Sequence, residues 1–216
     1  MKLTSFEREK IDNSDDFLFY QNPRYVHHLG SSFRRRLTRL YSKYLLENHI
    51  ILDLMSSWVS HLPHDVKYQK VIGHGLNESE LIANKILDQF FIQDLNKKQN
   101  LPFEDSSIDT CLIVAGWQYL QYPEKISTEL SRIIKSNSLL IISFTNRAFW
   151  TKAPNIWTNS TEDGRVEYVK KVISDKGWFV EKIFNEDTYE DRFFGLYKQI
   201  GDPFFSIIAR NNKSNN

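Results

Sequence analysis

Apolar residues along the chain change repeatedly from a helical spacing to short continuous runs. After Ser32, which is expected to cap a helix, apolar residues from Phe33 to Leu45 recur at intervals of three and four, and they predict a helix that ends near Asn48. An apolar run closed by an acid follows at 49–54 and predicts a buried parallel strand. The same patterns predict helices at 77–85, 124–134 and 165–176, and strands at 71–73, 90–94, 108–115, 139–144, 178–183 and 204–209.

This alternation of strands and helices is typical of an α/β protein. Seven strands joined by helical crossovers predict a Rossmann-like, doubly wound, mostly parallel sheet with helices on both faces. The sequence shows no repeat of fixed period, which argues against a solenoid or a propeller. We expect a single domain over 32–210, an N-terminal extension over 1–31 that is partly loose, and a disordered tail over 211–216.

Composition narrows the classes of partner and compartment. The chain has 41% hydrophobic and 14% aromatic residues, enough for a sizeable core, and its net charge of +1 gives no global field that would favour nucleic acid or an anionic membrane. Cys111 is the single cysteine, so no internal disulfide and no cysteine-based zinc cluster can form. The first residues are charged, and no apolar run is long enough to span a bilayer. We therefore expect a cytoplasmic protein or one of an organelle stroma, and the oligomeric state stays open.

The candidate chemistry lies at the ends of the predicted strands. In an open parallel sheet, ligands bind outside the carboxyl ends of the strands. Acids, small residues and an aromatic side chain follow four of the predicted strands, at 53–57, 74–77, 94–96 and 115–119. The sequence therefore predicts a binding site at this edge of the sheet.

A more specific signal lies between the third and fourth strands, where 101–109 reads Leu-Pro-Phe-Glu-Asp-Ser-Ser-Ile-Asp. Together with the strand at 51–54 and the segment 129–138, this block resembles the class I S-adenosylmethionine-dependent methyltransferases of the type 11 group. The resemblance covers roughly 45–145. It implies a methyltransferase that uses S-adenosylmethionine, and a last strand that runs antiparallel beside the fifth.

The resemblance also implies roles for particular residues. Asp53 would steer the amino group or the loop that holds the cofactor, Asp94 would accept a hydrogen bond from the adenine amino group, the Leu95 amide would donate to the ring, and Leu76 would pack against it. The full set of implied cofactor-binding residues is Asp53, Met55, Ser56, Ser57, Gly75, Leu76, Asn77, Asp94, Leu95 and Ala115.

Two departures from the family pattern leave an alternative open. The first loop of the family is Gly-x-Gly, whereas the aligned residues here are Met55, Ser56 and Ser57, as in a divergent subgroup. The acid that usually holds the ribose aligns with Gly75, so that Asn77 or Glu78 would have to replace it. The alternative is a non-catalytic binding or scaffold protein with the methyltransferase fold, in which the acids and serines only cap turns and helices.

Aromatic residues after the fourth and fifth strands mark the expected acceptor side. Trp117, Tyr119, Phe149 and Trp150 would form a flat apolar pocket for a small planar or lipophilic acceptor, or else pack a lid against the sheet. No catalytic residue is expected, because methyl transfer can proceed by holding donor and acceptor in line in a dry pocket. A third hypothesis is a zinc-dependent hydrolase, since two imidazoles and a carboxylate occur in the segment His61-Leu62-Pro63-His64-Asp65.

Overall fold

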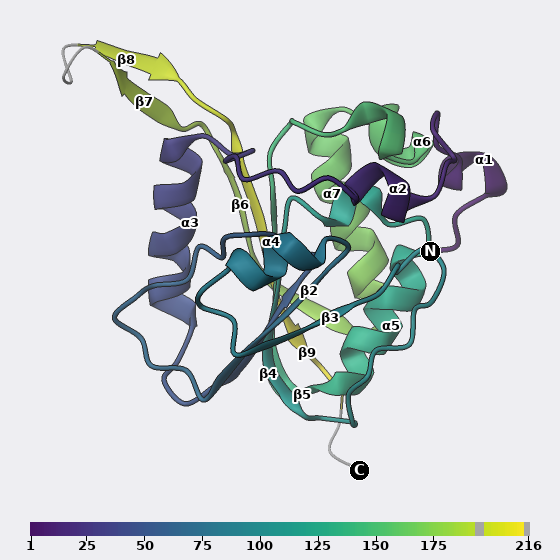
Figure 1. Cartoon of the computed structure of the whole chain (residues 1–216). Helices are drawn as coiled ribbons and strands as arrows, with labels where there is room; N and C mark the ends of the chain where they lie inside the picture. Colours follow the sequence, from purple (N-terminus) through teal and green to yellow (C-terminus); the bar gives the residue numbers. More distant parts are fainter. Residues whose placement is uncertain (193–196, 214–216) are drawn as a thin grey trace.

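A seven-stranded sheet forms the centre of the molecule in the computed structural model, which describes residues 1–192 and 197–213 (Figure 1). Its strand order is β3-β2-β1-β4-β5-β9-β6. Neighbours from β3 to β5 pair in parallel, and β9 pairs antiparallel with both β5 and β6. The predicted mostly parallel sheet with an antiparallel last strand is confirmed. The strands are β1 (Ile50–Leu54), β2 (Lys70–Gly75), β3 (Gln89–Ile92), β4 (Ile108–Val114), β5 (Ile134–Phe144), β6 (Trp178–Glu186) and β9 (Phe204–Asn211).

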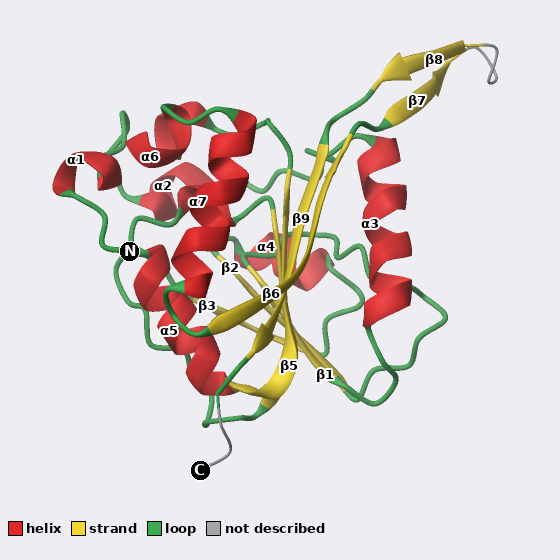
Figure 2. Ribbon diagram, turned by 180° about the vertical axis from the view of Figure 1, so that it is seen from behind, coloured by secondary structure: helices red, strands yellow, loops and turns green. Residues whose placement is uncertain are grey.

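Helices cover both faces of this sheet (Figures 1 and 2). Helix α3 (Ser31–Tyr44) lies on one face, α5 (Pro123–Ile133) and α7 (Glu162–Ser174) lie on the other, and α4 (Glu78–Ala83) follows β2. Successive side chains of a strand point to opposite faces, so Ile51 packs in the core beneath α3 while Leu52 packs in the core beneath α5 and α7. Both faces of β1 are therefore buried, as its apolar sequence predicted.

The bounds of three predicted helices were wrong, and α7 begins at Glu162 and ends at Ser174 where 165–176 was predicted. Ser32 lies inside α3 and does not cap it, because the helix begins at Ser31 after Gly30 and a distant acid takes the capping role. The carboxylate of Glu190 accepts the Ser32 N–H at 2.7 Å. The same helix ends at Tyr44, four residues before the predicted end near Asn48. Helix α4 ends at Ala83 and does not reach residue 85.

Several short elements were not predicted from the sequence. Residues 55–69, between β1 and β2, contain no helix. A hairpin follows β6 and projects away from the sheet (Figure 1). Its second strand, Tyr197–Ile200, carries exposed side chains, so no alternation of buried and exposed positions marks it. The unpredicted elements are α1 (Ser5–Arg8), α2 (Asp16–Tyr20), the 3-10 helices η1 (Trp117–Tyr119) and η2 (Trp150–Lys152), α6 (Asn155–Thr158), β7 (Tyr189–Arg192) and β8 (Tyr197–Ile200).

Residues 6–14 of the N-terminal segment pack along η2 and α6, and Figure 2 shows α1 beside α6. The Asp12 N–H donates to the carbonyl of Thr151 at 2.8 Å, and the Asn155 N–H donates to the carbonyl of Glu9 at 2.8 Å. At the other end of the chain, the buried Asn211 ends β9, and residues 214–216 of the predicted tail lie outside the described residues. The division of the chain into extension, domain and tail stays a prediction. Within the described residues, no helix combines the length and the apolar character needed to cross a bilayer.

Candidate functional site

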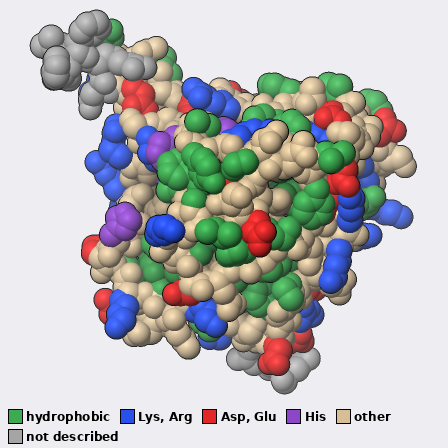
Figure 3. Space-filling view, in the orientation of Figure 1, with side chains coloured by type: hydrophobic (Ala, Val, Ile, Leu, Met, Phe, Trp, Pro, Cys, Tyr) green, Lys and Arg blue, Asp and Glu red, His purple; other side chains and the backbone are tan. Residues whose placement is uncertain are grey.

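A cavity of about 660 Å³ opens at the carboxyl ends of β1, β2 and β4, and the segment 16–29 contributes to its wall. Its volume falls within the roughly 300 to 1,000 Å³ of small-molecule sites. Hydrophobic side chains gather in several clusters on the face that carries α4 (Figure 3). The cavity wall includes the predicted site residues Asp53, Met55, Ser56, Ser57, Gly75, Leu76, Asn77, Asp94, Leu95, Ala115, Tyr119, Phe149 and Trp150. Trp117 is the exception, because its side chain is buried in the core on the α5 side of the sheet.

Asp53, the last residue but one of β1, lines this cavity and holds the loop that follows the strand. Its carboxylate accepts hydrogen bonds from the hydroxyl of Ser56, at 2.6 Å, and from the hydroxyl of Ser60. Burial raises the pKa of Asp53, while the two hydroxyl bonds oppose that rise. The hydroxyl of Ser57 donates in the same way to Glu80, at 2.6 Å. The serines therefore turn their protons toward acids of the chain and leave only oxygen lone pairs for a ligand.

Met55 adopts the left-handed backbone conformation that a glycine would adopt without strain, with φ of 60°. Its N–H donates to Nδ1 of His74 at 3.1 Å, and Nε2 of His74 donates to the carbonyl of Gln93 at 2.8 Å. Burial lowers the pKa of His74 to about 4, so the ring is neutral at pH 7 and Nδ1 is free to accept. A neutral imidazole thus braces the non-glycine loop against β2.

Two glycines make room for this loop. A Cβ atom on Gly116 would lie 2.7 Å from the Cβ of Met55, and a Cβ on Gly75 would lie 2.7 Å from the carbonyl oxygen of Ser56. Both distances are too short for real side chains. The space that a glycine in the first loop would leave is therefore supplied by glycines on the neighbouring strand exits.

The buried acid that lines the cavity after β2 is Glu80, which the sequence interpretation missed. The side chain of Asn77 caps α4 by accepting the Glu80 N–H at 3.0 Å and donates to the carbonyl of Tyr20 at 2.7 Å. Glu78 is exposed and does not line the cavity. Glu80 lines it and is 8% exposed. An Asn followed three residues later by Glu is a helix-start pattern, and this signal could have placed Glu80 in the first turn, facing the strand end.

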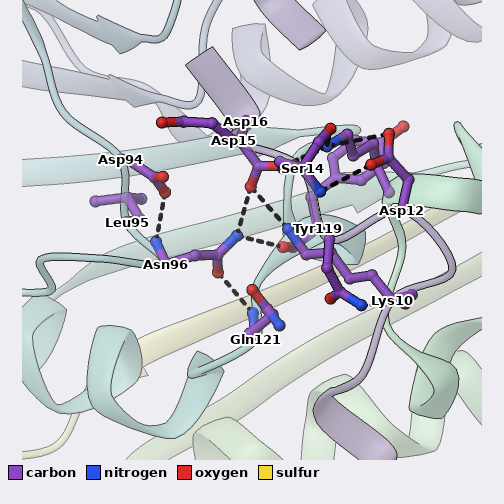
Figure 4. Close-up of polar contacts among 12 residues, drawn as sticks. Lys10, Asp12, Ser14, Asp15, Asp16, Asp94, Leu95, Asn96, Tyr119 and Gln121 are labelled. Carbon is purple, nitrogen blue, oxygen red and sulfur yellow. Dashed lines mark hydrogen bonds and ion pairs between the residues drawn. The ribbon is translucent and has the colours of Figure 1, made fainter. Parts of the chain in front are cut away.

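Asp94 lies buried at the exit of β3, where its carboxylate accepts the Asn96 N–H at 2.8 Å. The side-chain amide of Asn96 donates to the carbonyl of Tyr119 at 3.0 Å and to the carboxylate of Asp16 at 3.1 Å (Figure 4). Its side-chain oxygen accepts the Gln121 N–H at 2.8 Å. The loop after β3 is therefore joined directly to the N-terminal helix α2 and to the segment after β4.

Buried ion pairs fix the N-terminal segment over the cavity. Asp16 pairs with Lys10 at 2.7 Å and with Lys152 at 3.3 Å, and Lys152 also pairs with Asp12 at 3.2 Å. The Lys152 side chain is 1% exposed. Figure 4 shows the Asp16 carboxylate between the side-chain amide of Asn96 and the ammonium of Lys10. Because Lys10, Asp16 and Lys152 are buried, each of these three charges depends on its partners, and the ion pairs tie the N-terminal segment to η2.

The wall of the cavity formed by residues after β4 and β5 is aromatic. The rings of Tyr119 and Phe149 stack with centroids 6.1 Å apart, and the Phe149 N–H donates to the Tyr119 hydroxyl oxygen at 3.0 Å. Burial raises the pKa of Tyr119 to about 12, so its hydroxyl stays protonated at neutral pH. Trp150 is 46% exposed. The sequence interpretation missed the contributions of Tyr20, Arg24 and His28, which the N-terminal segment brings to the same wall.

The histidines of the zinc hypothesis do not form a ligand set with other residues. His61 lines the cavity, and burial lowers its pKa to about 4, whereas His64 is exposed. In the described part of the chain, no group of three or more His, Cys, Asp or Glu side chains is placed to hold a metal ion. The arrangement therefore offers no support for a zinc-dependent hydrolase.

Comparisons with known proteins identify the fold. A methyltransferase domain family model matches residues 58–142, which is less than half of the chain and begins directly after the loop of Met55, Ser56 and Ser57. A comparison of the sequence with curated proteins found no match.

Solved structures align with most of the chain at low identity. A chain from a Haloferax volcanii complex with the Trm112 methyltransferase activator has a TM-score of 0.64 at 13% identity, covering 86% of this chain and 92% of that one. A SAM-dependent methyltransferase from Aquifex aeolicus has a TM-score of 0.57 at 17% identity, covering 90% and 96%. The [4+2]-cyclase SpnF has a TM-score of 0.59 at 12% identity, covering 87% and 88%. The resemblance to class I S-adenosylmethionine-dependent methyltransferases is confirmed, and the chain has their α/β fold.

Proposed function

We propose that this protein binds S-adenosylmethionine in the cavity and transfers its methyl group to a small planar or lipophilic acceptor. One observation carries the proposal: three buried acids, Asp53, Glu80 and Asp94, line one cavity at the ends of consecutive strands of a methyltransferase fold. The ligand has three kinds of hydrogen-bond donor, namely its amino group, its ribose hydroxyls and its adenine amino group. A set of acceptors spread along the floor of a slot matches such a ligand.

Each acid has a proposed partner. Asp94 would accept from the adenine amino group, with the Leu95 amide beside it and Leu76 against the ring. Glu80 would accept from the ribose, in the role that the sequence interpretation gave to Asn77 or Glu78. Asp53 and the loop of Met55, Ser56 and Ser57 would bind the amino-acid end. Gly75 and Ala115 line the slot between these groups.

When bound, the cofactor supplies a methyl group on a positively charged sulfur, which is already activated for transfer. The residues of this chain would then act by position: Tyr119 and Phe149 orient a flat acceptor, and the N-terminal segment excludes water. Trp150, at the exposed rim, would contact the outer part of the acceptor. No side chain needs to act as an acid or a base, since holding donor and acceptor in line is sufficient for a nucleophilic acceptor atom.

A second candidate is a binding protein that carries out no transfer. It is favoured by the loop of Met55, Ser56 and Ser57, whose hydroxyls are already engaged by Asp53 and Glu80. The fold alone does not decide between the two, because a [4+2]-cyclase shares it. The neighbour that forms a complex with an activator protein makes a protein partner a further option within this candidate.

Ligand-induced thermal stabilisation tests the proposal. At about one hundred times the dissociation constant, a ligand stabilises the native state by about 2.7 kcal/mol, which corresponds to a rise in melting temperature of roughly 5 to 11 °C. We expect this shift with S-adenosylmethionine and with S-adenosylhomocysteine, but not with NAD or ATP. No shift for either sulfur compound at millimolar concentration would refute cofactor binding. Incubation with methyl-labelled donor and candidate acceptors then separates a transferase from a binding protein.

Two substitutions test whether the buried acids bind the cofactor. Asp94→Ala and Glu80→Gln each remove a hydrogen-bond acceptor from the cavity and should weaken S-adenosylhomocysteine binding about tenfold or more. Glu104→Ala is the matched control, because Glu104 is an exposed acid in the neighbouring loop and lies outside the cavity wall. Unchanged affinity in the Asp94 variant, measured by calorimetry, would show that this carboxylate only holds its own loop.

A further inference from the structure

The guanidinium of Arg24 is enclosed by aromatic rings on the acceptor side of the cavity. Its central carbon lies 4.7 Å from the ring centroid of Phe19, 5.6 Å from that of Tyr20 and 5.4 Å from that of Phe149. The ring of Phe149 in turn stacks with Tyr119. These contacts hold a flat cation in a fixed position beside a flat apolar surface, through the attraction between a cation and the faces of the rings.

The guanidinium of Arg24 forms no ion pair with an acid of the described chain. Its Nη2 donates to the carbonyl of Phe19 at 2.8 Å, whereas its Nη1 is buried without a hydrogen-bond partner among the described residues. Glu80 accepts only the Arg24 backbone N–H, at 2.6 Å. Lys152, which also lies over the Phe19 ring, has two acids beside it. A buried guanidinium nitrogen without an acceptor is costly, so its retention in a cavity wall calls for an explanation.

The geometry points to an anionic acceptor. We infer that the methyl acceptor is a planar molecule that carries a carboxylate, whose oxygens bind the Arg24 guanidinium while its ring packs against Phe149 and Tyr119. The inference rests on the proposed function and adds the chemical class of the substrate. A planar guanidinium fork matches a carboxylate in shape and charge, and rings around it exclude the water that would compete. The carboxylate of the acceptor would also attract the positively charged sulfur of the proposed donor in the same cavity.

Paired probes that differ only in charge test this inference. The probes are 2-naphthoate and 2-naphthamide, titrated by calorimetry into protein saturated with S-adenosylhomocysteine. We expect the carboxylate to bind at least tenfold more tightly than the amide in the parent protein, as a charge-assisted hydrogen bond predicts. Arg24→Gln should abolish this preference, and Arg24→Lys, which keeps the charge without the fork, should retain part of it.

Arg35→Gln is the matched control, because Arg35 lies on α3 outside the cavity wall and donates to the Ser31 hydroxyl at 3.0 Å. This variant should keep the full preference for 2-naphthoate. Equal affinities for the two probes in the parent, no binding of 2-naphthoate up to millimolar concentration, or an unchanged preference in Arg24→Gln would each overturn the inference. A melting shift with S-adenosylhomocysteine that persists in any of these cases leaves cofactor binding intact. Loss of that shift in the parent protein refutes the proposed function itself.

Discussion

Met55 and Gly116 provide a direct test of how a non-glycine first loop is accommodated. Met55 has φ of 60°, and its Cβ occupies the space that a side chain on Gly116 would need. In Gly116→Ala, the new Cβ would meet the Cβ of Met55 at 2.7 Å, the sulfur of Met55 at 3.1 Å and Cγ2 of Ile113 at 3.3 Å. The first contact is the decisive one, because a Cβ cannot move away without its backbone.

The magnitude follows from this contact. Overpacking of this kind destabilises a protein by about 1 to 3 kcal/mol, which corresponds to a fall in melting temperature of roughly 2 to 12 °C for a chain of this size. Met55→Gly removes a left-handed non-glycine residue, a gain of about 1 to 2 kcal/mol, but also gives up the packing of a partly buried side chain. Its net effect alone is therefore small. In the double variant the Cβ–Cβ contact no longer exists, so most of the destabilisation by Gly116→Ala should disappear.

Urea unfolding of the parent, both single variants and the double variant gives the coupling energy, which we expect to be about 1 to 3 kcal/mol. Met55→Ala combined with Gly116→Ala is the control, because alanine keeps the Cβ atom and should give little rescue. If Gly116→Ala costs the same free energy in the Met55→Gly background as in the parent, the two positions are independent. In that case, the absence of a side chain at Gly116 is not what makes room for Met55 in the first loop.

Three further predictions concern the same cavity. Gly75→Ala should displace the loop at Ser56, because the new Cβ would lie 2.7 Å from a backbone oxygen. We expect a loss of about 1 to 3 kcal/mol in the free energy of unfolding and weaker S-adenosylhomocysteine binding. An unchanged melting temperature and an unchanged dissociation constant would contradict this. The pKa of His74 is about 4 in the folded protein, against 6.5 for a free imidazole. Its contribution to the free energy of unfolding is therefore present above pH 6.5 and is lost as the pH falls toward 4. Between pH 7 and pH 5 the free energy of unfolding of the parent should therefore fall by about 2 kcal/mol more than that of His74→Gln. Equal losses in urea unfolding would show that His74 is not a buried neutral imidazole. Asp16→Asn removes an acid from the two buried lysines that it pairs with, and should lower the free energy of unfolding by about 3 to 5 kcal/mol and speed hydrogen exchange over 10–31. Unchanged exchange in that segment would show that these ion pairs do not hold it in place.

The sequence predicted the fold well because its strongest motif is structural. Leu101 and Phe103 of the Leu-Pro-Phe block present their carbonyl oxygens to the guanidinium of Arg132, at 3.3 and 2.8 Å. Glu129 accepts the Leu101 N–H at 2.7 Å, and Arg132 pairs with Asp105 at 2.7 Å. The two most recognisable segments therefore bind each other on the side of α5. They specify how β4 and α5 meet, and they carry no information about a ligand.

The parts of the site that the sequence did not predict depend on contacts between distant segments. Glu190 caps α3 across more than 150 positions, so the local pattern around Ser32 pointed to the wrong cap. Trp117 follows a strand exit as a pocket residue would, but the 3-10 turn directs its ring into the core. No periodic pattern marks Tyr20 and Arg24 as cavity residues, because buried ion pairs and hydrogen bonds to other segments bring them there. Local periodicity contains none of this information.

The distribution of these residues along the chain separates the proposed cofactor chemistry from the choice of acceptor. The family model matches 58–142, which includes Glu80 and Asp94 at the cofactor end of the cavity. Arg24, Tyr20 and Phe149 lie outside that region and line the wall that we propose for the acceptor. Because the N-terminal segment supplies two of these three side chains and is fixed to the β3 exit through Asn96, a change in this segment can alter the acceptor without altering the sheet. If the proposed function holds, the acceptor is selected by residues that the shared fold does not constrain, and Arg24 is the residue whose charge would most directly limit the choice.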